Sequence, residues 1–214
     1  GFILPKFFLE NCGAYLAAIR SIGRTEEYFY MPVFESAAMI PPQTRREALT
    51  EVRAQLDTVS GSILNIRVGG KDLSHAFGLR RPANRTIYDL RPVADILIDI
   101  VAAFGTQYVV SGPVWEYYSG EGWEEGLRRE MELDLLNGFT GKTVIHPNQI
   151  PVVNEMLRVS QRDYADARAI LNWDTGSGSL VSASEDGGRM NEYNTHSRWA
   201  RRIVLRAERY GVRA

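Results

Sequence analysis

Two acidic residues stand just after apolar segments that are typical of buried strands. Glu35 follows Met31–Phe34, and Asp72 follows the run that ends at Val68. The carboxyl ends of neighbouring parallel strands meet at one edge of a sheet, so the two side chains would share a site there. Two carboxylates favour a hard cation such as Mg²⁺, with water and substrate oxygens completing its shell. An acidic residue after a strand also commonly caps a helix, and that alternative stays open for Asp72.

Four further residues occupy similar positions, within or just after an apolar run. Gly69 and Gly70 permit close approach of the backbone to a ligand, or an unusual φ, although a plain turn explains them equally well. Arg67 lies within an apolar run, where an unpaired charge would be costly, so it should point to a carboxylate or to the open end of the strands. Lys6 follows the first apolar run in the same way. A structural ion pair is the alternative for both cations.

Two ring-bearing residues are weaker candidates for the same site. His146 precedes Pro147 and could act as a base or bind an anion, but a histidine that fixes a loop is the commoner outcome. Trp115 begins an aromatic cluster that could wall a pocket or pack in the core. The sequence contains no zinc-type pair of histidines and no glycine-rich phosphate loop. These absences exclude several common enzyme classes.

Apolar runs alternate with segments of helical periodicity, which is typical of a parallel α/β sheet. The expected strands are Phe2–Pro5, Phe29–Phe34, Ile63–Val68, Tyr108–Ser111 and Thr143–Ile145. The expected helices are Leu9–Ile22, Gln43–Val59, Val93–Phe104 and Trp123–Leu136. A closed (β/α)₈ (TIM) barrel has eight strands and about 250 residues. We therefore expect strands four to eight of such a barrel, with the N-terminal part of a larger domain missing from the sequence.

The pattern changes after Ile150. Val152–Val159, Asp163–Leu171 and a last segment, His196–Tyr210 capped by Thr195, look helical, with a linker at Asp174–Gly178 between them. A short strand at Leu180–Ser184 and a turn at Glu185–Gly188 complete this part. We expect residues 1–158 to form the barrel part, and residues 159–214 to form a C-terminal extension that packs elsewhere, for instance on a neighbouring subunit.

Charge and cysteine content limit the partners and the compartment. The chain carries 25 Lys and Arg against 26 Asp and Glu, so no global field favours nucleic acid or an anionic membrane. No apolar run approaches the roughly 20 residues that a membrane span needs. The single cysteine allows no intrachain disulfide, which favours a reducing, cytoplasmic location.

Five segments together carry a resemblance to a known family. They read GFILPK, MPVFES, RVGGKDL…GLRR, GKTVIHPNQIPVVN and DGGRMNE, in collinear order over most of the chain. They resemble the citrate lyase β-subunit-like family of the HpcH/HpaI aldolase superfamily, and in particular its divergent branch of carbon–carbon bond lyases of the TIM-barrel fold. The GK-x-x-IHP-x-Q segment is the most specific of them.

The resemblance implies an Mg²⁺-dependent barrel that cleaves or forms a carbon–carbon bond between an acyl-CoA and a keto acid. It assigns Glu35 and Asp72 to the metal. It also implies that Glu192, in place of the family's usual Asp, transfers a proton from a neighbouring subunit of a trimer or hexamer. Arg67, with backbone amides near Gly69 and Gly70, would orient the substrate carboxylate.

The remaining candidates, Lys6, Trp115 and His146, would line the substrate site. The family's catalytic Arg lies on an earlier strand and has no counterpart in this sequence.

Two other functions stay open. Arg80, Arg81 and Arg85 are the only concentrated basic residues that could bind the phosphates of CoA, and a solvated loop explains them equally well. The protein could therefore be a CoA-independent aldolase that acts on a free keto acid. It could also be a non-catalytic barrel partner, because five β/α units alone leave open sheet edges.

Overall fold

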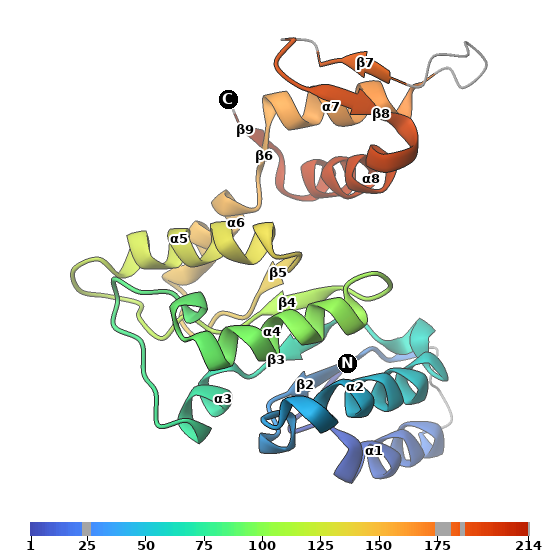
Figure 1. Ribbon diagram of the computed structural model, residues 1–214, viewed down its shortest axis with the longest axis vertical. Helices are drawn as coiled ribbons and strands as arrows, with labels where there is room; N and C mark the ends of the chain where they lie inside the picture. The colour runs from blue at the N-terminus through green and yellow to red at the C-terminus, as the bar shows by residue number, and fades with distance from the viewer. Residues whose placement is uncertain (23–26, 174–180, 185–186, 214) are drawn as a thin grey trace. The chain divides into compact units, whose positions relative to one another are not determined.

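The computed structural model describes residues 1–22, 27–173, 181–184 and 187–213 (Figure 1). The chain divides into two compact units, Gly1–Val153 (unit 1) and Asn154–Ala214 (unit 2). The expected linker at Asp174–Gly178, and the first two residues of the expected turn at Glu185–Gly188, lie outside the described residues. No described helix combines the length and the apolar character that crossing a bilayer requires.

Unit 1 is built on a parallel five-stranded sheet whose strand order follows the chain, β1-β2-β3-β4-β5. This order, with a helical connection after each strand, is the topology of a β/α barrel, and it confirms the expected fold class. The strands are β1 (Phe2–Leu4), β2 (Tyr30–Phe34), β3 (Ile66–Val68), β4 (Val110–Gly112) and β5 (Gly141–Lys142).

Six α-helices begin in the described part of unit 1: one follows each of β1, β2, β4 and β5, and two lie between β3 and β4. They are α1 (Leu9–Ser21), α2 (Pro42–Asp57), α3 (Gly70–Ala76), α4 (Arg91–Phe104), α5 (Trp123–Leu136) and α6 (Gln149–Met156). Short 3₁₀ turns lie at Ala37–Met39 (η2), Ser60–Ser62 (η3) and Ile87–Asp89 (η4). Proline in the first turn favours the starts of α2 and α4, because its fixed φ suits a helix and its missing N–H would have no partner there.

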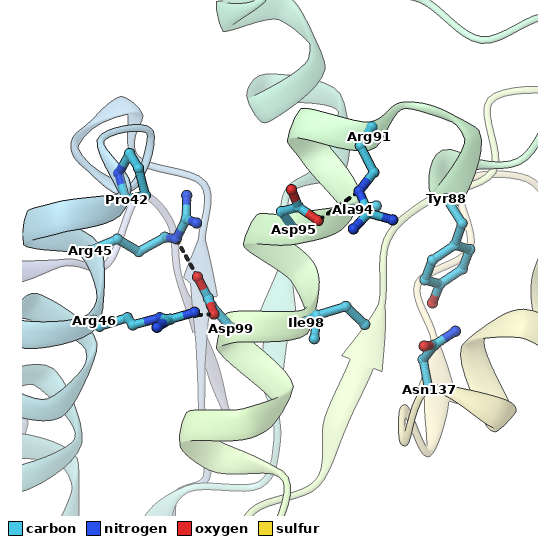
Figure 2. Close-up of a pocket in the computed structure, with 10 residues that line it drawn as sticks. All are labelled: Pro42, Arg45, Arg46, Tyr88, Arg91, Ala94, Asp95, Ile98, Asp99 and Asn137. Carbon is cyan, nitrogen blue, oxygen red and sulfur yellow. Dashed lines mark hydrogen bonds and ion pairs between the residues drawn. The ribbon is translucent and has the colours of Figure 1, made fainter.

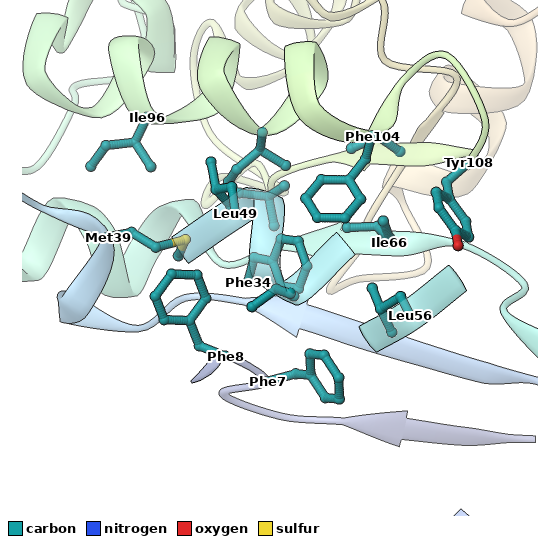
Figure 3. Close-up of a cluster of buried hydrophobic side chains, with 14 of the residues drawn as sticks. Phe7, Phe8, Phe34, Met39, Leu49, Leu56, Ile66, Ile96, Phe104 and Tyr108 are labelled. Carbon is teal, nitrogen blue, oxygen red and sulfur yellow. The ribbon is translucent and has the colours of Figure 1, made fainter. Parts of the chain in front are cut away.

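Alternation along the strands separates the two faces of the sheet. In β2 and β3 the buried side chains, such as Phe34 and Ile66, join the core beneath the helices (Figure 3). Phe34 packs against Phe104 of α4 with ring centroids 5.0 Å apart. Val33 and Arg67, which are paired in register, lie on the opposite face and are only half-buried. That face corresponds to the interior of a barrel.

The last strand of the sheet does not lie where the apolar run predicted it. Thr143–Ile145 was expected, but Gly141 and Lys142 pair with Ser111 and Gly112 instead. Lys142 can lie in this strand with a buried side chain because two carboxylates of α5 contact its ammonium. The apolar Ile145 is 54% exposed in the loop that follows. The hydrophobic pattern alone therefore placed this strand too late.

Unit 2 has a small core of its own between two helices, α7 (Gln161–Leu171) and α8 (Tyr193–Tyr210). Two short strand pairs accompany them: parallel β6 (Val159–Ser160) with β9 (Val212–Arg213), and antiparallel β7 (Val181–Ala183) with β8 (Met190–Glu192).

Two expected helix limits in this part of the chain were wrong. The helix expected over Val152–Val159 ends at Met156, and Val159 pairs in β6. The final helix begins three residues before His196, so Thr195 lies inside its first turn and Glu192 occupies the cap position. Thr195 Oγ1 donates a hydrogen bond to Glu192 Oε2 instead, at 3.3 Å.

Candidate metal and substrate site

The carboxyl ends of β1, β2 and β3 bring Lys6, Glu35 and Asp72 together. Glu35 is the first residue after β2, and Asp72 lies in the first turn of α3. The backbone N–H of Lys6 donates to Glu35 Oε1 at 3.0 Å, and its Nζ lies 3.3 Å from Asp72 Oδ1. One residue thus contacts both carboxylates, which places the three at a common edge of the sheet, as the strand pattern predicts.

The glycine pair after β3 has two separate roles. A Cβ at Gly69 would lie 2.3 Å from Glu35 Oε2, so only glycine leaves room for this carboxylate. A Cβ at Gly70 would lie 2.6 Å from the side chain of Pro113, so Gly70 is required for packing. The N–H of Gly69 donates to Phe34 O at 3.0 Å, and it is therefore not free to bind a substrate carboxylate, contrary to the role expected for it.

Mg²⁺ fits the donors present at this edge. Glu35 and Asp72 supply carboxylate oxygens, and the missing side chain of Gly69 leaves the space in which the Glu35 carboxylate lies. Mg²⁺ keeps several waters and is usually bound by one or two carboxylates together with substrate oxygens. The described residues contain no cluster of three or more His, Cys, Asp or Glu that could hold a metal, so any ion here would rely on these two carboxylates, water and substrate.

Arg67 lies on the barrel-interior face of the sheet, half-buried between its register partners Val33 and Ser111. Its Nε donates to Thr143 Oγ1 at 3.4 Å, just beyond β5. This long, neutral contact leaves most of the guanidinium's donors for an anion. The position agrees with an arginine that points towards the open ends of the strands.

The loop after β5 is fixed by His146 and Gln149. The His146 ring stacks on Tyr118 with centroids 4.2 Å apart, and its Nδ1 accepts the N–H of Asn148. Gln149 is buried, and its Nε2 donates to the carbonyl oxygens of Trp115 and Tyr117. His146 therefore has the loop-fixing contacts that were the alternative to a chemical role.

Trp115 is completely buried, so its ring offers no surface to a solute. Its Nε1 donates to Trp123 O at 2.9 Å, and the Arg81 guanidinium lies over its ring at 5.1 Å. Of the two roles considered for Trp115, core packing is the one that describes its place in the structure.

A buried network of charges between α5, β5 and η4 was not anticipated from the sequence. Lys142 Nζ contacts Glu130 Oε1 and Asp134 Oδ2, both at 2.7 Å, and none of the three side chains is more than 1% exposed. Arg81, also buried, pairs with the second oxygen of Glu130 at 3.0 Å. Tyr88 completes the network by donating to Asp134 Oδ1. The only signal of this network in the sequence was the pair Gly141 and Lys142, which begins the most specific segment of the family resemblance.

The network keeps its protons in a fixed arrangement. Burial lowers the pKa of Lys142, but the Asp134 and Glu130 carboxylates outweigh it and hold that pKa above its usual value. Burial, together with the Asp134 carboxylate, raises the pKa of Tyr88, so its hydroxyl stays protonated. Burial raises the pKa of Asp134 as well, and the Lys142 ammonium opposes that rise. With both carboxylates ionised, Lys142 and Arg81 balance Glu130 and Asp134, and the group holds α5 against β5 and η4.

Glu192 belongs to unit 2 and lies at the end of β8. Its backbone N–H donates to His196 Nδ1 at 3.0 Å. Three residues earlier, Arg189 bonds the carboxylates of Asp163 and Asp166 on α7, and the hydrogen bonds outweigh burial so that the pKa of Asp163 is lowered. The GRMNE segment is thus clamped to α7.

One surface hollow of the structure lies away from these residues. It measures about 620 Å³ and lies on the outer surface over α4, beside α2 and η4 (Figure 2). Its arginines already pair with aspartates: Arg45 and Arg46 with Asp99, and Arg91 with Asp95. The strand-end residues Glu35 and Asp72 are not among its lining.

Comparison with known proteins identifies the family. Residues 1–212 match the family described as C–C bond lyase of the TIM-barrel fold. The chain belongs to this family. A segment of 74 residues is also 38% identical to the L-malyl-CoA/β-methylmalyl-CoA lyase of Cereibacter sphaeroides (strain ATCC 17025 / ATH 2.4.3). That segment is 34% of this chain and 22% of the relative's length, so the match covers well under two thirds of that lyase.

Solved structures support the fold. The citrate lyase from Burkholderia xenovorans LB400 superposes with a TM-score of 0.70 at 16% identity, over 99% of this chain and 64% of that one. The protein CitE from Mycobacterium tuberculosis, in complex with magnesium, acetoacetate and coenzyme A, gives 0.60 at 20% identity, over 96% of this chain and 77% of that one. At these identities the likeness concerns the fold alone.

Proposed function

We propose that this protein is an Mg²⁺-dependent lyase that cleaves or forms a carbon–carbon bond between an acyl-CoA and a keto acid. The observation that carries the proposal is the meeting of Lys6, Glu35 and Asp72 at one edge of the sheet. Membership of the C–C bond lyase family supports it, as do the names of the malyl-CoA lyase relative and of the magnesium-bound structural neighbour.

In this proposal the side chains divide the work of binding and proton transfer. Glu35 and Asp72 hold Mg²⁺, which when bound polarises the oxygen of the keto acid. Arg67 orients a substrate carboxylate by a charge-assisted hydrogen bond. Glu192, supplied by a neighbouring subunit of a homo-oligomer, protonates the acyl fragment. His146 fixes the loop after β5, and the buried Trp115 supports this loop through its carbonyl oxygen, which Gln149 contacts.

The test is calorimetric titration of Mg²⁺ into the full-length protein, with and without glyoxylate. We expect binding that the keto acid strengthens and that Glu35→Gln or Asp72→Asn abolishes, because each variant loses a charged ligand. Glu10→Gln, which removes a carboxylate on α1, is the control and should bind Mg²⁺ as the wild type does. Retained affinity in the site variants would contradict the assignment.

A CoA-independent aldolase remains the second candidate because of one observation. Arg81 is buried against Glu130, while Arg80 pairs with Glu116 and Arg85 with Asp89, so all three basic residues proposed for the CoA phosphates have partners. Cleavage assays with malyl-CoA and citryl-CoA separate the candidates. Turnover of free keto acids without any thioester cleavage would favour the aldolase. Mg²⁺ binding without turnover of either would favour the non-catalytic partner.

A further inference from the structure

Lys6 has an unusual backbone conformation that fixes both of its contacts. Its φ is 51°, the only positive value for a non-glycine among the described residues. Such a conformation is strained for a residue with a Cβ. Asn11 Nδ2 holds the carbonyl of Lys6 at 2.7 Å, while the N–H of Lys6 holds Glu35. The turn after β1 is therefore anchored on both sides of this residue.

The anchored turn directs the ammonium to the carboxylate pair. Lys6 Nζ lies 3.3 Å from Asp72 Oδ1, and the side chains are 67% and 47% exposed. Such an exposed pair contributes little stability and can exchange its partner. The ammonium nevertheless lies where a divalent cation shared by Glu35 and Asp72 would meet an additional positive charge.

We propose that the Lys6 ammonium is a displaceable counter-ion, which competes with the divalent cation for Asp72 and, once released, pairs with the carboxylate of the keto acid. The inference rests on the proposed function, because it takes Glu35 and Asp72 as the metal ligands. Its physical basis is that Asp72 cannot fully serve both cations, whereas a keto-acid carboxylate bound beside the metal offers the ammonium a new partner. Keto-acid binding would then remove the competitor and strengthen metal binding.

The experiment compares Mg²⁺ titrations of the full-length wild type, Lys6→Met and Lys6→Asn, each with and without glyoxylate. Asparagine tolerates the left-handed conformation, so Lys6→Asn preserves the turn if methionine disturbs it. Both variants keep the N–H that holds Glu35. Lys71→Met is the matched control, because it removes the same charge from the exposed residue beside Asp72.

We expect the Kd for Mg²⁺ alone to fall by about three- to thirtyfold in both Lys6 variants, because a positive charge near the ion is removed. In Lys71→Met it should change by no more than about twofold, the effect expected of a screened surface charge. The strengthening of Mg²⁺ binding by glyoxylate should be equal in the wild type and the Lys71 variant, and smaller in both Lys6 variants, where only the direct contacts of the keto acid with the metal and with Arg67 remain.

Two results would overturn the inference while leaving the metal site intact. One is an affinity for Mg²⁺ in both Lys6 variants that is equal to or lower than that of the wild type. The other is a gain in Mg²⁺ affinity in Lys71→Met as large as that in the Lys6 variants. Glyoxylate strengthening that is undiminished in both Lys6 variants would refute the release to substrate. Absence of Mg²⁺ binding in every protein would instead refute the proposed function itself, and with it the counter-ion role.

Discussion

At Gly69 the absence of a side chain determines where a carboxylate can lie. The position that a Cβ would take is 2.3 Å from both Cβ and Oε2 of Glu35, far inside van der Waals contact. Glu35 Cβ is bonded to the backbone and cannot rotate away, so the end of β2 would have to shift and pull the carboxylate from the N–H of Lys6. Gly69, at the end of β3, therefore limits where the carboxylate of Glu35 can lie at the end of β2.

The first prediction follows from that contact. Gly69→Ala should lower Mg²⁺ affinity by at least about tenfold, because a misplacement of about 1 Å at a reacting group can cost far more in rate. Calorimetry gives the affinity, and circular dichroism checks the fold. Gly13→Ala is the control: nothing lies within 4 Å of a Cβ there, so this helical substitution should leave Mg²⁺ affinity unchanged. Equal Mg²⁺ affinity in the two variants would contradict the steric argument.

The sequence predicted the strand-end residues better than it predicted their neighbours. Glu35, Asp72 and Lys6 could be assigned to one edge because each follows an apolar run, and the order of parallel strands then brings them together. Arg81 was taken for a solvated or phosphate-binding residue. It is buried because of Glu130, which lies 49 positions later in the chain. Local patterns do not reveal such a distant partner.

Among the elements, α5 and β5 depend on charge where sequence periodicity suggests apolar contact. Lys142 lies in the last strand, and its two partners lie one turn apart on α5, at Glu130 and Asp134. The fifth strand was consequently expected two residues too late. From the sequence alone, a cation beside an apolar run is interpreted as an exposed residue, because the helix that neutralises it is not known.

Removing the lysine of this network should destabilise unit 1 severely. Lys142→Met leaves Glu130 and Asp134 facing each other in the interior, and we expect a loss of about 3–5 kcal/mol in the free energy of unfolding. Chemical denaturation followed by circular dichroism measures it. Lys71→Met, an exposed substitution, should change the free energy of unfolding by less than about 0.5 kcal/mol. A loss below about 1 kcal/mol in Lys142→Met would show that the carboxylates find other compensation.

At the scale of the whole molecule, each unit has a separate hydrophobic core. Leu97 is fully buried in the core of unit 1, and Ile203 is buried in the smaller core of unit 2. A helix pair of this size gains little from its own core, so unit 2 should be the less stable of the two. We therefore expect two unfolding transitions.

Matched truncations test this expectation by differential scanning calorimetry. Leu97→Ala should shift only the transition of unit 1, and Ile203→Ala only that of unit 2, each through a loss of about 2–5 kcal/mol. A single transition displaced by both substitutions would mean instead that the units unfold cooperatively.

The charge balance of the buried network limits which substitutions these positions can accept during evolution. Two cations and two carboxylates cancel, and each carboxylate oxygen of Glu130 and Asp134 receives at least one donor. Any one replacement leaves an uncompensated buried charge, whereas an apolar set of similar volume can be neutral or even stabilising. Positions 81, 130, 134 and 142 should therefore be inherited as a unit, and covary among relatives as a group in which intermediates are rare.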